Sequence, residues 1–143
     1  MIHYLQTKLT KNLLALRKIF FWIALFWTGI ILYLCLIKSS NLPKIGVDIP
    51  NFDKYIHAFF HLTFTILWFL YFKIYLKKSN NKKLFVIVFL LSFCFGVTIE
   101  VLQTVFTTTR NGDPVDVLAN SIGAVLGILA ISVLEKIRHS YKN

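Results

Sequence analysis

Four long apolar stretches dominate the chain and are separated by short polar segments. Each is long enough for an α-helix to cross a bilayer, which takes about 20 residues. None of them alternates apolar and polar residues, the pattern that predicts a half-buried strand. Lipid offers no hydrogen-bond partners to the backbone, which also favours helices. The pattern therefore predicts an all-α bundle of four transmembrane helices, with spans at about residues 19–37, 54–76, 84–106 and 115–134.

The composition supports a membrane protein rather than a water-soluble one. The chain is 57% hydrophobic and 15% charged, whereas soluble domains average about 25% charged residues. A net charge of +10 raises nucleic-acid binding as an alternative. The basic residues, however, lie in short clusters beside the apolar stretches and form no nucleic-acid motif. Such clusters are typical of contacts with anionic lipid, so we expect membrane lipids as partners and no nucleic acid.

The basic clusters also predict the orientation of the chain. They lie in the N-terminal arm, between the second and third spans, and in the C-terminal tail. Alternating spans put all three clusters on one side, and cytoplasmic loops are enriched in lysine and arginine. We therefore expect both termini inside the cell. Residues 1–18 then form a basic cytoplasmic arm, either amphipathic or frayed, residues 19–134 form the membrane domain, and residues 135–143 form a basic tail.

Neither cysteine points to a disulfide or to a metal site. Cys35 and Cys94 both lie in apolar surroundings, where a thiol behaves as a small hydrophobic group. They form no CxxC pair, and the histidines form no HExxH motif. The sequence therefore predicts no metal site and no cofactor.

Polar residues gather toward one end of the predicted bundle, in its outer third. Glu100 lies deep inside the third apolar stretch, and an ionisable residue at membrane depth points to a functional site. Asp53 and His57 share one helix face, as do Asp116 and Asn120, because each pair is four residues apart. Unpaired polar groups are costly in hydrocarbon, so these side chains should converge in one pocket. The expected pocket residues are Asp53, His57, Glu100, Gln103, Arg110, Asp113, Asp116 and Asn120.

Several of these polar residues also have structural explanations. Asp53 and Asp116 are each suited to cap the helix that they begin. Asn120, Gly123 and Gly127 would let two helices approach closely and hydrogen-bond. For these residues the sequence leaves both interpretations open.

Two further residues, Arg110 and His61, have expected roles of their own. Arg110 is the expected counter-ion for Glu100, Asp113 or Asp116, because its guanidinium can hold a carboxylate with two hydrogen bonds. His61 lies one turn deeper than the outer end of its span, and a single buried histidine is usually a structural group. We therefore expect His61 to be structural.

The sequence resembles the VanZ-like family at these same residues. The matching segments are 53–57 (DKYIH), 100–103 (EVLQ), 110–117 (RNGDPVDV) and 120–124 (NSIGA), together with Gly127. VanZ-like proteins are small bacterial membrane proteins, and the founding member is associated with low-level resistance to the glycopeptide antibiotic teicoplanin. The resemblance implies a multi-pass protein of the bacterial cytoplasmic membrane and brings no defined reaction with it.

Two classes of function fit this pattern. In the first, a cell-envelope protein binds a lipid, a lipid-linked wall precursor or an amphiphilic antibiotic in the polar pocket and so contributes to glycopeptide resistance. In the second, a membrane hydrolase or transferase acts on envelope lipids or polyprenyl-linked substrates, with Glu100, His57 and Asp116 as candidate catalytic residues. An ion-coupled transporter is disfavoured, because the polar groups form no path across the membrane.

Overall fold

Four long helices make up the computed structural model, which describes residues 2–37, 50–76, 79–107 and 112–141, with only the backbone described for residues 2–10. The helices are α1 (Ile2–Leu36), α2 (Phe52–Tyr75), α3 (Asn81–Phe106) and α4 (Pro114–Ser140). All four contain a segment long and apolar enough to cross a membrane. The described residues contain no strand, so the predicted all-α class is confirmed.

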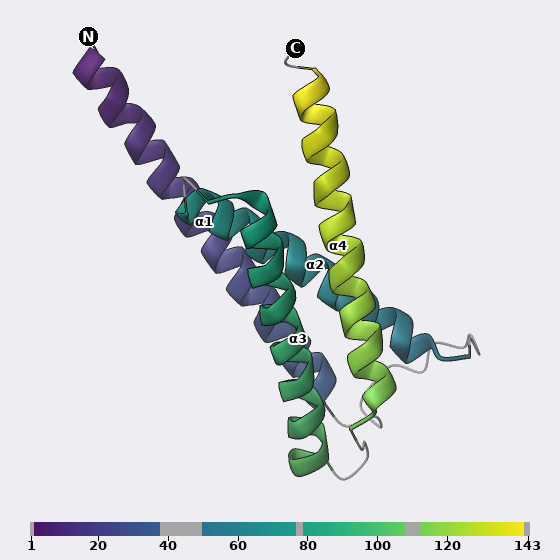
Figure 1. Ribbon diagram of the computed structural model, residues 1–143. Coiled ribbons are helices and arrows are strands. Elements are labelled where there is room, and N and C mark those ends of the chain that lie inside the picture. Colours follow the sequence, from purple (N-terminus) through teal and green to yellow (C-terminus); the bar gives the residue numbers. More distant parts are fainter. Residues whose placement is uncertain (1, 38–49, 77–78, 108–111, 142–143) are drawn as a thin grey trace.

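The helices alternate in direction, and the start of α1 and the end of α4 lie at the same end of the bundle (Figure 1). The end of α3 and the start of α4 lie at the opposite end, and α2 crosses α4 obliquely. Both termini therefore lie on one side, as an even number of membrane crossings requires. Which side faces the cytoplasm stays a prediction from the basic clusters.

Two helices extend past the predicted spans. α1 already begins at Ile2, so it continues unbroken from the predicted arm into the first span, and α4 continues to Ser140 in the predicted tail. Hydropathy indicates where a helix lies in lipid, but it does not indicate where the backbone hydrogen bonds stop. Lysine, arginine and glutamate are good helix formers and prolong a helix into water. The division into arm, membrane domain and tail stays a prediction.

The starts of α2 and α4 do not use the predicted caps. Asn51 is the N-cap of α2, in the left-handed conformation with φ 58° and without a side-chain cap hydrogen bond, while Asp53 lies within the first turn. Asp113 is the N-cap of α4, where its side chain accepts a hydrogen bond from the Val115 N–H at 2.8 Å. The capping interpretation was therefore wrong for both Asp53 and Asp116. Both carboxylates are free for other contacts.

α2 and α4 pack closely through small residues. A Cβ atom added at Gly123 would lie 2.0 Å from the carbonyl oxygen of Ala58, and one added at Gly127 would lie 2.9 Å from that of Leu62. Only glycine leaves room for this approach of two backbones. The packing interpretation of both glycines is therefore supported. Their contact holds the first turns of α2 against α4, where the polar residues lie.

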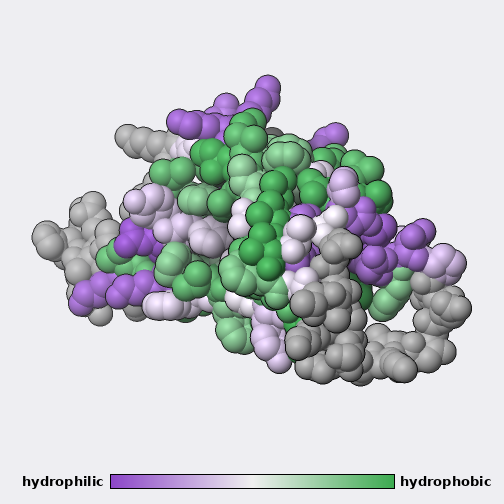
Figure 2. All heavy atoms as spheres, turned by 90° about the horizontal axis from the view of Figure 1, so that it is seen from below, coloured by the Kyte–Doolittle hydropathy of each residue, from purple (hydrophilic) through white to green (hydrophobic). Residues whose placement is uncertain are grey.

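The apolar interior of the bundle is small. One cluster of buried residues joins α1, α2 and α3, and a second joins α2, α3 and α4. Only 17% of the most apolar window of α1 is buried, compared with 33% in each of the other helices. Hydrophobic residues cover much of the face seen in Figure 2, while hydrophilic residues lie mostly toward its edges. Many large apolar side chains are thus exposed on the outside of the bundle, as contact with lipid requires.

A buried polar site where three helices meet

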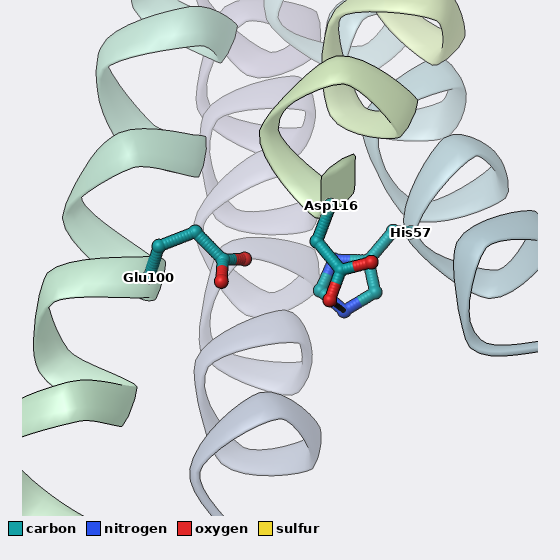
Figure 3. Close-up of side chains that lie close together, drawn as sticks. All are labelled: His57, Glu100 and Asp116. Atoms are coloured by element: carbon teal, nitrogen blue, oxygen red, sulfur yellow. Dashed lines mark ion pairs between the residues drawn. The ribbon is translucent and has the colours of Figure 1, made fainter. Parts of the chain in front are cut away.

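Three of the predicted site residues meet near the start of α2, the end of α3 and the start of α4. His57, Glu100 and Asp116 are 4%, 7% and 8% exposed. Their side chains point toward one another from three different helices (Figure 3). Each offers one nitrogen or oxygen atom such that these atoms lie within 4.8 Å of one another. The predicted convergence of polar groups is therefore present for these three residues.

Lys54 joins three aspartates at this end of the bundle. Its ammonium lies 2.7 Å from Asp116 Oδ1, 2.9 Å from Asp113 Oδ2 and 3.0 Å from Asp53 Oδ2. Its side chain is only 21% exposed, whereas that of Asp53 is 49% exposed at the rim. The hydrogen bond from Lys54 holds the pKa of Asp113 below its ordinary value, with help from the Val115 N–H. Lys54 thus fastens the start of α2 to the start of α4.

Sequence reasoning missed Lys54 and assigned the positive charge to Arg110. Arg110 lies outside the described residues, so its pairing stays a prediction. One signal for Lys54 was available: it lies between Asp53 and His57, three residues before the histidine, on a neighbouring part of the same helix surface.

The ring of His57 is oriented by Asn120. His57 Nδ1 lies 3.1 Å from Asn120 Oδ1, and His57 Nε2 lies 3.9 Å from Asp116 Oδ2. An amide oxygen only accepts hydrogen bonds, so in this arrangement Nδ1 carries the proton and donates it to Asn120. In the neutral ring Nε2 then presents a lone pair toward Asp116. Asn120 therefore belongs to the site as the residue that fixes the histidine.

Glu100 has one oxygen bound and one oxygen free. Its Oε2 accepts a hydrogen bond from the Asp113 N–H at 2.8 Å, at the positive end of α4. Its Oε1 is buried and has no hydrogen-bond partner among the residues that the structure describes. A buried polar atom without a partner is costly. This oxygen can therefore accept a hydrogen bond or bind a cation from outside the described residues.

A cavity of about 340 Å³ lies beside Glu100, between the end of α3 and the start of α4. Most of its other wall residues are apolar or small: Val101, Thr104, Gly112, Pro114 and Val117. Gly112 permits the chain to approach Glu100 closely at this wall, because a Cβ there would lie 2.6 Å from the Glu100 carbonyl oxygen. The cavity thus combines one carboxylate with a largely apolar wall.

Two polar residues of the predicted spans lie away from this cluster. The Gln103 amide donates a hydrogen bond to the Cys35 carbonyl oxygen at 2.9 Å, which ties α3 to α1. His61 Nδ1 lies 2.8 Å from Ser92 Oγ in the interior of the bundle. Both contacts are structural ties between helices. Gln103 is therefore not brought into the expected pocket, and His61 fits the structural role expected for it.

The fold and the site together define a multi-pass membrane protein with four helices and a buried cluster of histidine and acidic residues near one end. The chain belongs to the VanZ/LLP1 family, which matches residues 3–135 of its 143 residues. This match confirms the resemblance noted from the motifs and extends it over α1. No curated protein and no solved structure matches the chain.

Proposed function

We propose that this VanZ-like protein binds an amphiphile of the cell envelope from the outer leaflet: a lipid, a lipid-linked wall precursor or a glycopeptide antibiotic. The Glu100 carboxylate, in the wall of a cavity of about 340 Å³ that is otherwise largely apolar, carries the proposal. A hydrogen-bond donor on the head group would bind this carboxylate. An acyl chain would lie against Val101 and Val117 and the surrounding lipid. Binding sites commonly combine an apolar wall with a few polar groups that orient the ligand.

The outer-leaflet location follows from the charge distribution along the chain. The clusters of lysine and arginine lie toward the end of the bundle opposite the cavity, and such clusters favour the cytoplasmic side. A ligand in the outer leaflet of the bacterial cytoplasmic membrane would reach Glu100 without crossing the bilayer. Protection against teicoplanin, which carries an acyl chain, is the role that the VanZ-like resemblance favours.

A matched pair of glutamate substitutions tests the proposal in cells. Glu135 lies at the other end of the bundle, where its carboxylate is 3.7 Å from Lys73. Glu135→Gln therefore makes the same chemical change away from the cavity. At equal expression, Glu100→Gln should lose teicoplanin protection and the co-purifying amphiphile, and Glu135→Gln should keep both. If Glu100→Gln retains both at full expression, the cavity does not bind this ligand.

A membrane enzyme is the second candidate, and one observation favours it. His57, Glu100 and Asp116, the residues suited to acid–base chemistry, are buried together, and Glu100 also lines the cavity. Purified protein would be incubated with labelled phospholipids and polyprenyl-linked lipids at varied pH and with varied metal ions. Product formation that is lost in Asp116→Asn would support a hydrolase or transferase. The absence of any product under all these conditions would refute the enzyme hypothesis.

A further inference from the structure

We infer that His57, Glu100 and Asp116 bind one divalent transition-metal ion, with Zn²⁺ or Mn²⁺ as the fitting ions. The sequence predicted no metal site, because the three side chains come from three helices and form no local motif. The inference starts from the atoms that the hydrogen bonds of these side chains leave over: Nε2 of His57, Oε1 of Glu100 and Oδ2 of Asp116. His57 Nε2 and Asp116 Oδ2 are already 3.9 Å apart.

Each of the three side chains is held by a partner that leaves its other atom available. Metal-binding histidines and carboxylates in proteins are held in this way by outer hydrogen bonds, which fix the tautomer and the direction of the ligand. The three holding groups are the Asn120 amide oxygen for His57, the Asp113 N–H for Glu100 and the Lys54 ammonium for Asp116. The cluster is therefore arranged as a ligand set and not only as an ion-pair network.

Charge also favours a cation at this place. Lys54 neutralises Asp116 directly, but within the described residues no cation contacts Glu100. The Glu100 side chain is 7% exposed, so its negative charge is separated from water as well. A divalent ion between the two carboxylates would neutralise the buried charge and supply the missing partner of Glu100 Oε1.

The donor set decides the class of ion. One imidazole nitrogen with two carboxylate oxygens suits Zn²⁺ or Mn²⁺, whereas Ca²⁺ needs about 6–8 oxygen ligands. Tetrahedral ligands at about 2.1 Å from Zn²⁺ lie roughly 3.4 Å apart. One donor atom from each residue lies within 4.8 Å of the other two, so binding requires the side chains to close by up to about 1.4 Å. The long side chain of Glu100 can supply this movement by rotating about its own bonds.

Metal binding is tested on the full chain, purified in detergent without a histidine tag and treated with EDTA. ZnCl₂ or MnCl₂ alone is then titrated by calorimetry, and bound metal is counted by mass spectrometry after desalting. Wild-type protein should bind one ion per chain. Glu100→Gln should bind at least tenfold more weakly, and Glu135→Gln should bind like the wild type. His139→Gln, a change in the exposed last turn of α4, should also leave binding unchanged.

Three results would overturn the metal site. They are a wild-type protein that binds neither ion, a Glu100→Gln variant that binds as tightly as the wild type, and a loss of binding in His139→Gln. If Glu100→Gln does not fold, the wild-type protein still tests the metal site. An ion that binds only the native state must raise the unfolding temperature of the wild-type protein. Two results together would instead support Arg110 as the counter-ion of Glu100. The wild type would bind no metal, and Arg110→Gln would unfold at a lower temperature than the wild type. Since no lipid or antibiotic is added, this test can fail while the proposed amphiphile binding stands, and the reverse also holds.

Discussion

A single methyl group at Gly123 should separate α2 from α4. A Cβ atom there would lie 2.0 Å from the Ala58 carbonyl oxygen, 2.8 Å from its carbonyl carbon and 2.9 Å from its Cα. Ordinary van der Waals contact begins at 3.4 Å, so the helices must move by the difference between 3.4 and 2.0 Å, which is 1.4 Å. Backbone atoms cannot rotate away as the end of a flexible side chain can. The whole helix has to shift.

The expected cost lies at the upper end of the range for overpacking, about 3 kcal/mol. Alanine is a better helix former than glycine by about 1 kcal/mol, so Gly123→Ala should destabilise the protein by roughly 2 kcal/mol. Unfolding is followed by tryptophan fluorescence during titration of mixed micelles with SDS. The shift also moves His57 away from Asn120, so teicoplanin protection should fall even at temperatures where the variant remains folded.

Gly29→Ala provides the matched control, because a Cβ at Gly29 would meet no atom within 4 Å. It makes the same change of residue in a membrane helix, so the intrinsic preference for alanine cancels in the comparison. The two variants should differ by about 3 kcal/mol. If Gly123→Ala is as stable as Gly29→Ala, the close approach of α2 and α4 is not the packing that holds the site together.

Two further substitutions test the ties around the site. Lys54→Met leaves three aspartates without their shared ammonium. It should destabilise the protein by about 2 kcal/mol, because part of the contact is buried. If Lys54→Met is as stable in the SDS titration as Lys83→Met, a control at an exposed position, this tie is refuted. Ser92→Ala removes the hydroxyl that contacts His61 and should cost about 1 kcal/mol in the same titration. Ser92→Ala should leave teicoplanin susceptibility unchanged, and a loss of protection would give His61 a role in the site.

The fold could be predicted from the sequence because one physical requirement dominates it. A stretch of about 20 apolar residues can satisfy its backbone in lipid only as a helix, and four such stretches give four helices. The helix ends were harder to predict. Where α1 begins and α4 ends depends on backbone hydrogen bonds in water, which the hydropathy of the spans does not report. The cap at Asp113 was missed because Asp116 is an equally suitable residue only three positions further on.

Site residues could be predicted where an ionisable residue lies at membrane depth. They could not be predicted where the role depends on the direction of a side chain or on contacts between distant parts of the chain. Glu100 and His57 were found because a buried ionisable residue needs a partner. Gln103 was grouped with Glu100 because it follows three residues later, yet such positions differ in direction by about 60° around a helix. That angle turns Gln103 toward α1. Lys54 was missed because its contacts with Asp113 and Asp116 span 59 and 62 residues of sequence.

Asp113 performs its tasks with separate parts of the same residue. Its side chain caps α4 and accepts from Lys54, while its peptide N–H holds Glu100. A side-chain substitution at position 113 would remove the first two contacts but leave the third intact, since every residue except proline has this N–H group. Conversely, any displacement of the Glu100 carboxylate pulls directly on the main chain where α4 begins. A ligand that displaced Glu100 would therefore also move the start of a whole membrane helix.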